Sequence, residues 1–147
     1  MTEAEDPARS LLLLDTHVLV WLVEGINLLG AKARSVLQKA ADQGTVLVSA
    51  ITPWEIALLV SKNRLKLNQD LMPWLQEALV QSEATIAPLE LEIAGASTRL
   101  PFEMHADPAD RILVATARHL GATLVTADRA LLDLAASGGF RAIDASR

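Results

Sequence analysis

Short runs of Leu, Val and Ile alternate along this chain with longer segments whose apolar residues recur at helical spacing. The runs lack the strict apolar–polar alternation of a half-exposed strand, which indicates strands covered on both faces. Strands and helices in alternation predict an α/β fold with a mainly parallel central sheet of about five strands, flanked by helices. The expected strands are 11–15, 45–49, 84–88, 122–126 and 140–143. The expected helices are roughly 16–24, 31–42, 53–61, 70–82, 89–99, 108–119 and 129–136.

The composition narrows the class of protein. The 147 residues suffice for one domain with a sizeable core, and 51% of them are hydrophobic, which excludes a disordered chain. The chain has no Cys, which excludes disulfides, thiolate metal ligands and cysteine catalysis. The formal net charge is -5, which argues against nucleic-acid binding through a generally basic surface. A divalent-cation site remains compatible with this balance, because the cation offsets clustered carboxylates.

The N-terminal segment 1–10, MTEAEDPARS, is polar and acidic. It lacks the basic and apolar regions of a signal peptide. No apolar run in the sequence reaches the roughly 20 residues that a membrane helix needs. We therefore expect a short disordered leader at 1–10, a single domain over 11–147, no membrane association and a cytoplasmic location.

Two aspartates directly follow expected strands. Asp15 ends the first apolar run, and Asp128 comes two residues after the LVT of the fourth. In open parallel sheets, functional groups gather beyond the carboxyl ends of the strands. We therefore expect Asp15 and Asp128 to share one edge of the sheet.

Two further acids stand in the first turns of expected helices. In TPWE, Thr52 is the expected N-cap and Glu55 completes a capping box. DPAD repeats this layout, with Asp107 as the cap and Asp110 three residues later. Capping alone would account for Glu55 and Asp110. Their carboxylates could accept hydrogen bonds from the free N–H groups of the first turn and interact favourably with the positive end of the helix dipole.

Taken together, the four acids fall where strand ends and helix starts converge on one rim of an α/β sheet. Four neighbouring carboxylates cannot all remain ionised without a counter-charge. All-oxygen ligation suits Mg²⁺ or Mn²⁺. A site of this kind activates water for attack on phosphorus and neutralises charge on the transferring phosphate. The residues therefore predict a metal-dependent phosphoryl-transfer or phosphodiester enzyme.

Three segments carry a resemblance to a known family: LLLDTHVLVWL, VSAITPWEIALLVSKNRLKL and DPADRILVATARHLGATLVTADRAL. From about residue 11 onward, the chain resembles PIN-domain toxins of the VapC kind. The four acids that are typical of the family occur in this chain in the family's order. They are Asp15 after the first strand, Glu55 after SAIT, Asp110 before RIL and Asp128 in TAD. Each motif alone is weak, but the ordered set is specific.

The resemblance implies a PIN-like fold and an endoribonuclease that requires Mg²⁺ or Mn²⁺ and hydrolyses RNA phosphodiester bonds through metal-activated water. Asp15, Glu55, Asp110 and Asp128 would be its catalytic acids. Asp15, Asp110 and Asp128 would bind the metal directly or through water, and Glu55 would position a water. The resemblance also implies a toxin of a bacterial toxin–antitoxin pair, held inactive by a cognate antitoxin, and a homodimer.

Four other residues are candidates for supporting roles: Thr16, Asp107, Thr126 and Arg111. Thr16 and Thr126 flank the acids and could hydrogen-bond a carboxylate or phosphate. Alternatively, Thr16 caps the first helix and Thr126 merely ends a strand. Asp107 is interpreted mainly as an N-cap, with a place in the metal shell as the alternative. Arg111 could contact phosphate or pair with a neighbouring acid.

The remaining polar residues near these positions receive plainer interpretations. His17 directly follows Asp15, but we expect it to pack or lie on the surface, because hard cations prefer oxygen ligands. His105 is expected to be an ordinary surface residue. The basic cluster Lys62, Arg64 and Lys66 could meet RNA phosphates or could form a solvated connection between helices.

Other functions fit the same acids less well. A dehalogenase-like phosphatase needs two aspartates two positions apart after its first strand, and this chain has DTH there. A receiver domain needs an acidic pair before its phosphoacceptor and a Lys after a late strand, but Asp15 has no acidic neighbour in its strand and FRAIDASR has no Lys. A DNA-directed flap nuclease needs additional DNA-gripping elements. Two alternatives stay open: a non-catalytic PIN-like interaction module, and another metal-dependent phosphate-handling α/β enzyme.

Overall fold

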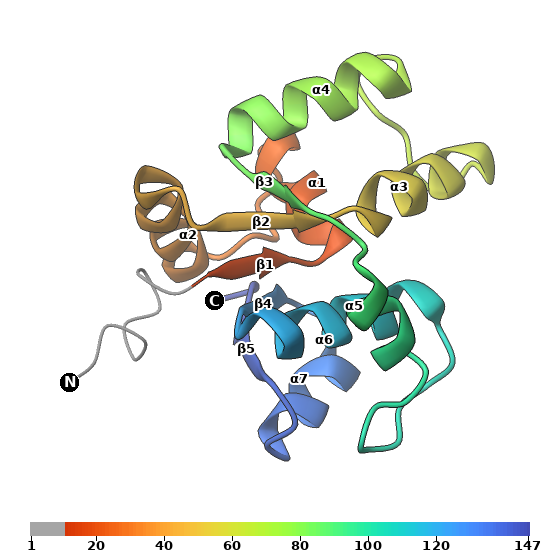
Figure 1. The fold of residues 1–147 in the computed structure, drawn as a ribbon. Coiled ribbons are helices and arrows are strands. Elements are labelled where there is room, and N and C mark those ends of the chain that lie inside the picture. Colours follow the sequence, from red (N-terminus) through yellow and green to blue (C-terminus); the bar gives the residue numbers. More distant parts are fainter. Residues whose placement is uncertain (1–10) are drawn as a thin grey trace.

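A computed structural model describes residues 11–147, so the leader expected at 1–10 lies outside the described residues. Five parallel strands form one sheet in the order β3-β2-β1-β4-β5 (Figure 1). The strands are β1 (Leu12–Leu14), β2 (Val46–Ser49), β3 (Thr85–Ala87), β4 (Thr123–Thr126) and β5 (Arg141–Asp144). The helices of the described chain are α1 (Thr16–Glu24), α2 (Ala31–Gln43), α3 (Ile51–Ser61), α4 (Leu71–Ser82), α5 (Leu91–Ala96), α6 (Pro108–Leu120) and α7 (Arg129–Ala136). The predicted α/β fold with a parallel sheet is confirmed.

The core consists of two layers of apolar side chains, one on each face of the sheet. Leu12 and Leu14 of β1 belong to the layer that α1, α2 and α4 cover. Leu13, which points to the opposite face, belongs to the layer under α6 and α7. All three leucines have no exposed surface, and burying each stabilises the fold by about 1.5–3 kcal/mol. Burial on both faces explains why the first apolar run shows no alternation.

All five strands run parallel, so their carboxyl ends meet at one edge of the sheet. The register pairs Leu14 at the end of β1 with Val48 on one side and Val125 on the other. Thr126 at the end of β4 pairs in turn with Asp144 at the end of β5. α1, α3 and α7 begin directly beyond this edge, which therefore collects the residues that follow β1, β2 and β4.

One predicted helix start is wrong. α3 begins at Ile51, so Thr52 is buried inside the first turn and is not the N-cap. The predicted capping box at TPWE does not form, because the Ile51 N–H already donates to the hydroxyl of Ser49 at 3.1 Å. Glu55 is therefore not explained as a member of that capping box.

α5 is shorter than predicted. It covers Leu91–Ala96 instead of 89–99, and Ser97 ends it by donating its hydroxyl to the carbonyl of Ala94 at 2.7 Å. The chain then crosses the surface to the start of α6. Within residues 11–147, every helix falls short of the length and apolarity that crossing a membrane would require.

Candidate active site

Asp15 is buried between the end of β1 and the start of α1, and both of its carboxylate oxygens accept hydrogen bonds. It is the N-cap of α1, and Oδ1 accepts from the N–H of Thr16 at 2.7 Å. Oδ2 accepts from the hydroxyl of Thr126 at 2.7 Å. Only 4% of Asp15 is exposed. A buried ionised carboxylate needs partners of this kind, and each oxygen keeps a further lone pair for another ligand.

Thr126 connects Asp15 to Asp128. Its hydroxyl donates to Asp15 and accepts from the backbone N–H of Asp128 at 3.0 Å. The Asp128 carboxylate caps α7 by accepting from the N–H of Leu131 at 3.2 Å. The hydroxyl at the end of β4 therefore fixes the position of one acid and the backbone of the next, as the carboxylate-binding alternative for Thr126 predicted.

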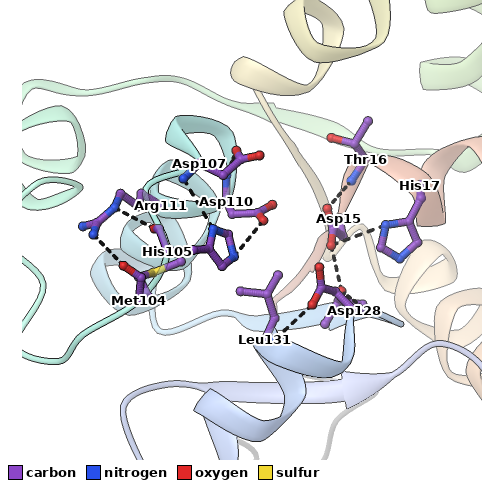
Figure 2. A network of polar contacts seen from close by, with 11 residues as sticks. Asp15, Thr16, His17, Met104, His105, Asp107, Asp110, Arg111, Asp128 and Leu131 are labelled. Atoms are coloured by element: carbon purple, nitrogen blue, oxygen red, sulfur yellow. Dashed lines mark hydrogen bonds and ion pairs between the residues drawn. The ribbon is translucent and has the colours of Figure 1, made fainter. Parts of the chain in front are cut away.

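Glu55 and Asp110 come to the same place from α3 and α6. A cavity of about 330 Å³ is lined by all four acids and by Asp107. The carboxylates of Asp15, Asp110 and Asp128 point toward a common space between β1, α6 and α7 (Figure 2). The sequence predicted these acids at strand ends and in first helical turns. For Glu55 this is wrong, because α3 begins at Ile51 and its first turn contains no acidic residue, but Glu55 still lines the same cavity as the other three acids.

The crowding of these acids changes how they ionise. Burial, followed by the charges of Asp15 and Asp107, raises the pKa of Asp110 to about 7. Burial also raises the pKa of Glu55, while a hydrogen bond with Thr16 works in the opposite direction. Ionising all of these neighbouring carboxylates near neutral pH therefore costs free energy in the folded protein.

The residues fit a hard divalent cation. The polar groups that converge on the cavity from the four acids offer oxygen ligands only, which is the donor set of Mg²⁺ or Mn²⁺. The pKa of Asp110 is raised by its burial and by the negative charge of its neighbours, and a bound cation would offset that charge. Asp15, Asp110 and Asp128 could hold such an ion, and Glu55 of α3 lines the same cavity.

The cavity is not acidic throughout. Val20, Trp21 and Leu59 contribute an apolar wall to its lining, and Arg64 contributes a positive charge. Of the basic cluster 62–66, Arg64 alone lines this cavity. A polyanion entering the cavity would therefore meet an apolar surface and the cation Arg64 as well as the carboxylates.

Asp107 and Arg111, two of the candidates for supporting roles at the site, stabilise local structure. Asp107 is exposed and caps α6 by accepting from the N–H of Asp110 at 3.1 Å, as predicted. Arg111 donates to the carbonyls of Met104 at 2.8 Å, His105 at 3.0 Å and Ser97 at 3.4 Å. Its guanidinium therefore fastens the loop before α6 and is not paired with an acid.

Thr16 is the first residue of α1 and not its cap, so the capping alternative is wrong. Asp15 takes that position because its carboxylate reaches the N–H of Thr16. The Thr16 side chain is instead turned toward α3, where it hydrogen-bonds with Glu55 and lies 3.4 Å from the hydroxyl of Thr52.

Two histidines contact the acids, which the sequence did not indicate. His17 packs against Trp21 with ring centroids 4.9 Å apart, and its Nδ1 lies 3.5 Å from Oδ2 of Asp15. His105 is exposed, but its Nε2 lies 3.3 Å from Oδ2 of Asp110 (Figure 2). Spacing gave no signal for His105, because its position depends on how Arg111 folds the loop.

Comparison with known proteins identifies the family. A sequence profile described as "PIN domain" matches residues 12–137. The chain is also 34% identical over 119 residues to "Ribonuclease VapC22" of Mycobacterium tuberculosis (strain ATCC 25618 / H37Rv), covering 81% of this chain and 88% of that protein. The chain belongs to the PIN-domain family. The matched region contains Asp15, Glu55, Asp110 and Asp128.

Solved structures agree with this PIN fold. The structure titled "Crystal structure of VapBC2 from Rickettsia felis bound to a DNA fragment from their promoter" aligns with a TM-score of 0.68 and 18% identity, covering 91% of this chain and 98% of the other. "Structure of FitAB bound to IR36 DNA fragment" aligns with a TM-score of 0.61 and 21% identity, covering 93% and 96%. At these identities, the likeness concerns the fold of the PIN domain.

The Thr126 hydroxyl gives a testable prediction about this PIN domain. Thr126→Val keeps the side-chain shape but removes the donor to Asp15 and the acceptor for the Asp128 N–H. We expect unfolding free energy to fall by about 1–3 kcal/mol and divalent-metal affinity to fall roughly 10- to 100-fold. Chemical denaturation and a Mn²⁺ titration measure the two effects. Thr126→Ser, which keeps the hydroxyl, should stay near the wild type; equal losses in both variants would contradict the role of the hydroxyl.

Proposed function

We propose that this chain is a Mg²⁺- or Mn²⁺-dependent endoribonuclease, the toxin of a toxin–antitoxin pair. The observation that carries the proposal is the convergence of four carboxylates on one cavity, where crowding raises the pKa of Asp110 to about 7. Such an arrangement is costly to the fold unless a cation is part of its function. The similarity to Ribonuclease VapC22 supports RNA as the substrate.

Asp15, Asp110 and Asp128 would hold the cation, which when bound lowers the pKa of water and neutralises charge on a phosphate. Other residues of the chain orient the Asp15 carboxylate and the attacking water. Thr16 and Thr126 fix the Asp15 carboxylate in one orientation. Glu55 faces the same cavity and is suited to accept a hydrogen bond from the attacking water and so orient it.

The substrate would lie across the cavity. Arg64, which lines the cavity, is placed to attract an RNA phosphate. Trp21 and the apolar wall beside it exclude water from one side of the reacting phosphate, which strengthens the electrostatic interactions within the site.

The partners belong to the same proposal. The solved structures with this fold are titled as VapBC2 and FitAB assemblies on DNA. We propose that this chain is held inactive by a cognate antitoxin protein and that it forms a homodimer. The combined toxin–antitoxin assembly, rather than this acidic chain alone, would then account for any binding to DNA.

The proposal is tested by incubating the purified protein with total cellular RNA in Mg²⁺, in Mn²⁺ and in a chelator. The protein is first denatured and refolded to remove any bound antitoxin, and its circular dichroism is checked. Metal-dependent cleavage that the chelator abolishes is the expected result, and sequencing of the fragment ends identifies the bond that is cut. A refolded protein that leaves RNA intact in both metals would contradict the enzyme and favour a non-catalytic PIN-like module.

A further inference from the structure

A second cavity lies at the same edge of the sheet, beside β5. It has a volume of about 450 Å³ and lies between the start of α2, the start of α7 and the end of β5. Three cations line it, Lys32, Arg129 and Arg147, against one carboxylate, Asp144. This basic cavity therefore carries net positive charge in a chain whose formal net charge is -5.

Asp144 organises the two arginines of the basic cavity. Its Oδ1 accepts from the N–H of Ser146 at 2.9 Å and from the Ser146 hydroxyl at 2.6 Å. Its Oδ2 lies 3.6 Å from the guanidinium of Arg129 and 3.8 Å from that of Arg147. The hydrogen bonds with Ser146 lower the pKa of Asp144, so the carboxylate stays ionised between both guanidinium groups.

The backbone also fixes Arg147 against α2. The N–H of Ala33 donates to the Arg147 carbonyl at 2.9 Å, and the N–H of Gly30 donates to the Ala145 carbonyl at 2.9 Å. A Cβ on Gly30 would lie 2.0 Å from the Arg147 carbonyl oxygen, so this close approach requires glycine. The position of Arg147 beside the basic cavity is therefore built into the fold.

The basic cavity neighbours the cavity of about 330 Å³ that the four acids line, here called the acidic cavity. Asp128 lines the acidic cavity, and the next residue, Arg129, lines the basic one. β4 and β5 are adjacent, and their register pairs Thr126, which binds Asp15, with Asp144. The backbone at Asp144, whose carboxylate contacts Arg129 and Arg147, therefore lies about one strand spacing, roughly 4.8 Å, to the side of the end of β4.

We infer that the basic cavity binds a backbone phosphate of the RNA strand, next to the phosphate that reacts among the carboxylates. This inference rests on the ribonuclease function proposed above. A polyanion held only by an acidic site would be repelled, and the nearby Arg111 is already committed to three carbonyls. The Arg129 and Arg147 side chains are 70% and 80% exposed, and exposed ion pairs of this kind contribute little. Both guanidinium groups can therefore turn to a phosphate at small cost.

The test compares two double variants that remove the same charge. Lys32→Gln/Arg129→Gln removes two cations of the basic cavity. Arg34→Gln/Lys39→Gln removes two exposed cations of α2 that line neither this cavity nor the acidic one. Binding of a fluorescently labelled single-stranded RNA is followed by anisotropy in chelator, where no cleavage occurs, over a range of salt concentrations.

We expect the first variant to bind roughly 5- to 10-fold more weakly at about 0.1 M salt, with a salt slope of log affinity smaller by about 0.7, since one single-strand phosphate contact contributes about 0.7. The control should keep the wild-type slope. Equal changes in both variants, or no change in the first, would overturn the inference. A wild-type protein that does not bind the RNA would also overturn it, whereas failure of metal-dependent cleavage with RNA binding intact would contradict only the proposed enzyme.

Discussion

Replacing Asp15 with Asn is expected to reduce metal-dependent RNA cleavage by at least about 100-fold. Asn keeps the size of the side chain and can still accept from the N–H of Thr16, so the N-cap of α1 survives. The change removes one negative charge from the cavity and the proposed metal ligand that two hydrogen bonds hold in place. Initial cleavage rates in Mg²⁺ and Mn²⁺, measured beside circular dichroism of both proteins, check this expectation.

Asp133→Asn is a matched control for this change. Asp133 is an exposed aspartate of α7 that does not line the acidic cavity, and its replacement removes the same charge. The control should cleave RNA at the wild-type rate. An Asp15→Asn protein that cleaves as fast as this control would show that the observed activity comes from elsewhere.

Asp110→Asn is expected to stabilise the metal-free protein while it impairs cleavage. Burial and four neighbouring carboxylates raise the pKa of Asp110 to about 7, so ionising it costs free energy in the folded state. In chelator at about pH 8, we expect the variant to be more stable by on the order of 2 kcal/mol, which corresponds to a melting temperature roughly 5 °C higher. Thermal denaturation followed by circular dichroism measures the difference.

The direction of the pH dependence follows from the same shift. The unfolded chain releases the Asp110 proton near its ordinary pKa of 3.8, whereas the folded chain keeps it up to about pH 7. Wild-type stability therefore falls as pH rises between these values. The advantage of Asp110→Asn should be absent below about pH 4 and complete above about pH 7. A variant that is less stable than the wild type at about pH 8 in chelator would contradict the crowding of the carboxylates.

Residue pattern alone predicts most of this fold. The leucines of β1 have no exposed surface on either face of the sheet, and their lack of alternation correctly indicated a parallel, fully covered strand. Asp15 and Asp128 share a sheet edge because the chain places each just after a parallel strand. The Asp107 cap was predictable because it depends only on local chemistry, a side chain reaching an N–H three residues on.

Features that depend on distant contacts could not be predicted. The capping box at Thr52 failed for a local reason instead, because the hydroxyl of Ser49, two residues earlier, already accepts the N–H of Ile51. His105 contacts Asp110 from the loop before α6, and the conformation of that loop depends on Arg111, which binds the carbonyls of Ser97, Met104 and His105. The basic cavity joins Lys32 to Arg147, which lie near opposite ends of the sequence and meet only when β5 completes the sheet.

The central claim, that the clustered carboxylates form a divalent-metal site, is tested most directly by titrating the refolded, metal-free protein with Mn²⁺ in a calorimeter. Running the titration at about pH 7 in two buffers of different ionisation enthalpy gives the number of protons released. We predict that Mn²⁺ binds and displaces roughly half a proton, because Asp110 is about half protonated at that pH, and that the release disappears near pH 9. Absence of binding, or binding without proton release at about pH 7, would contradict the claim.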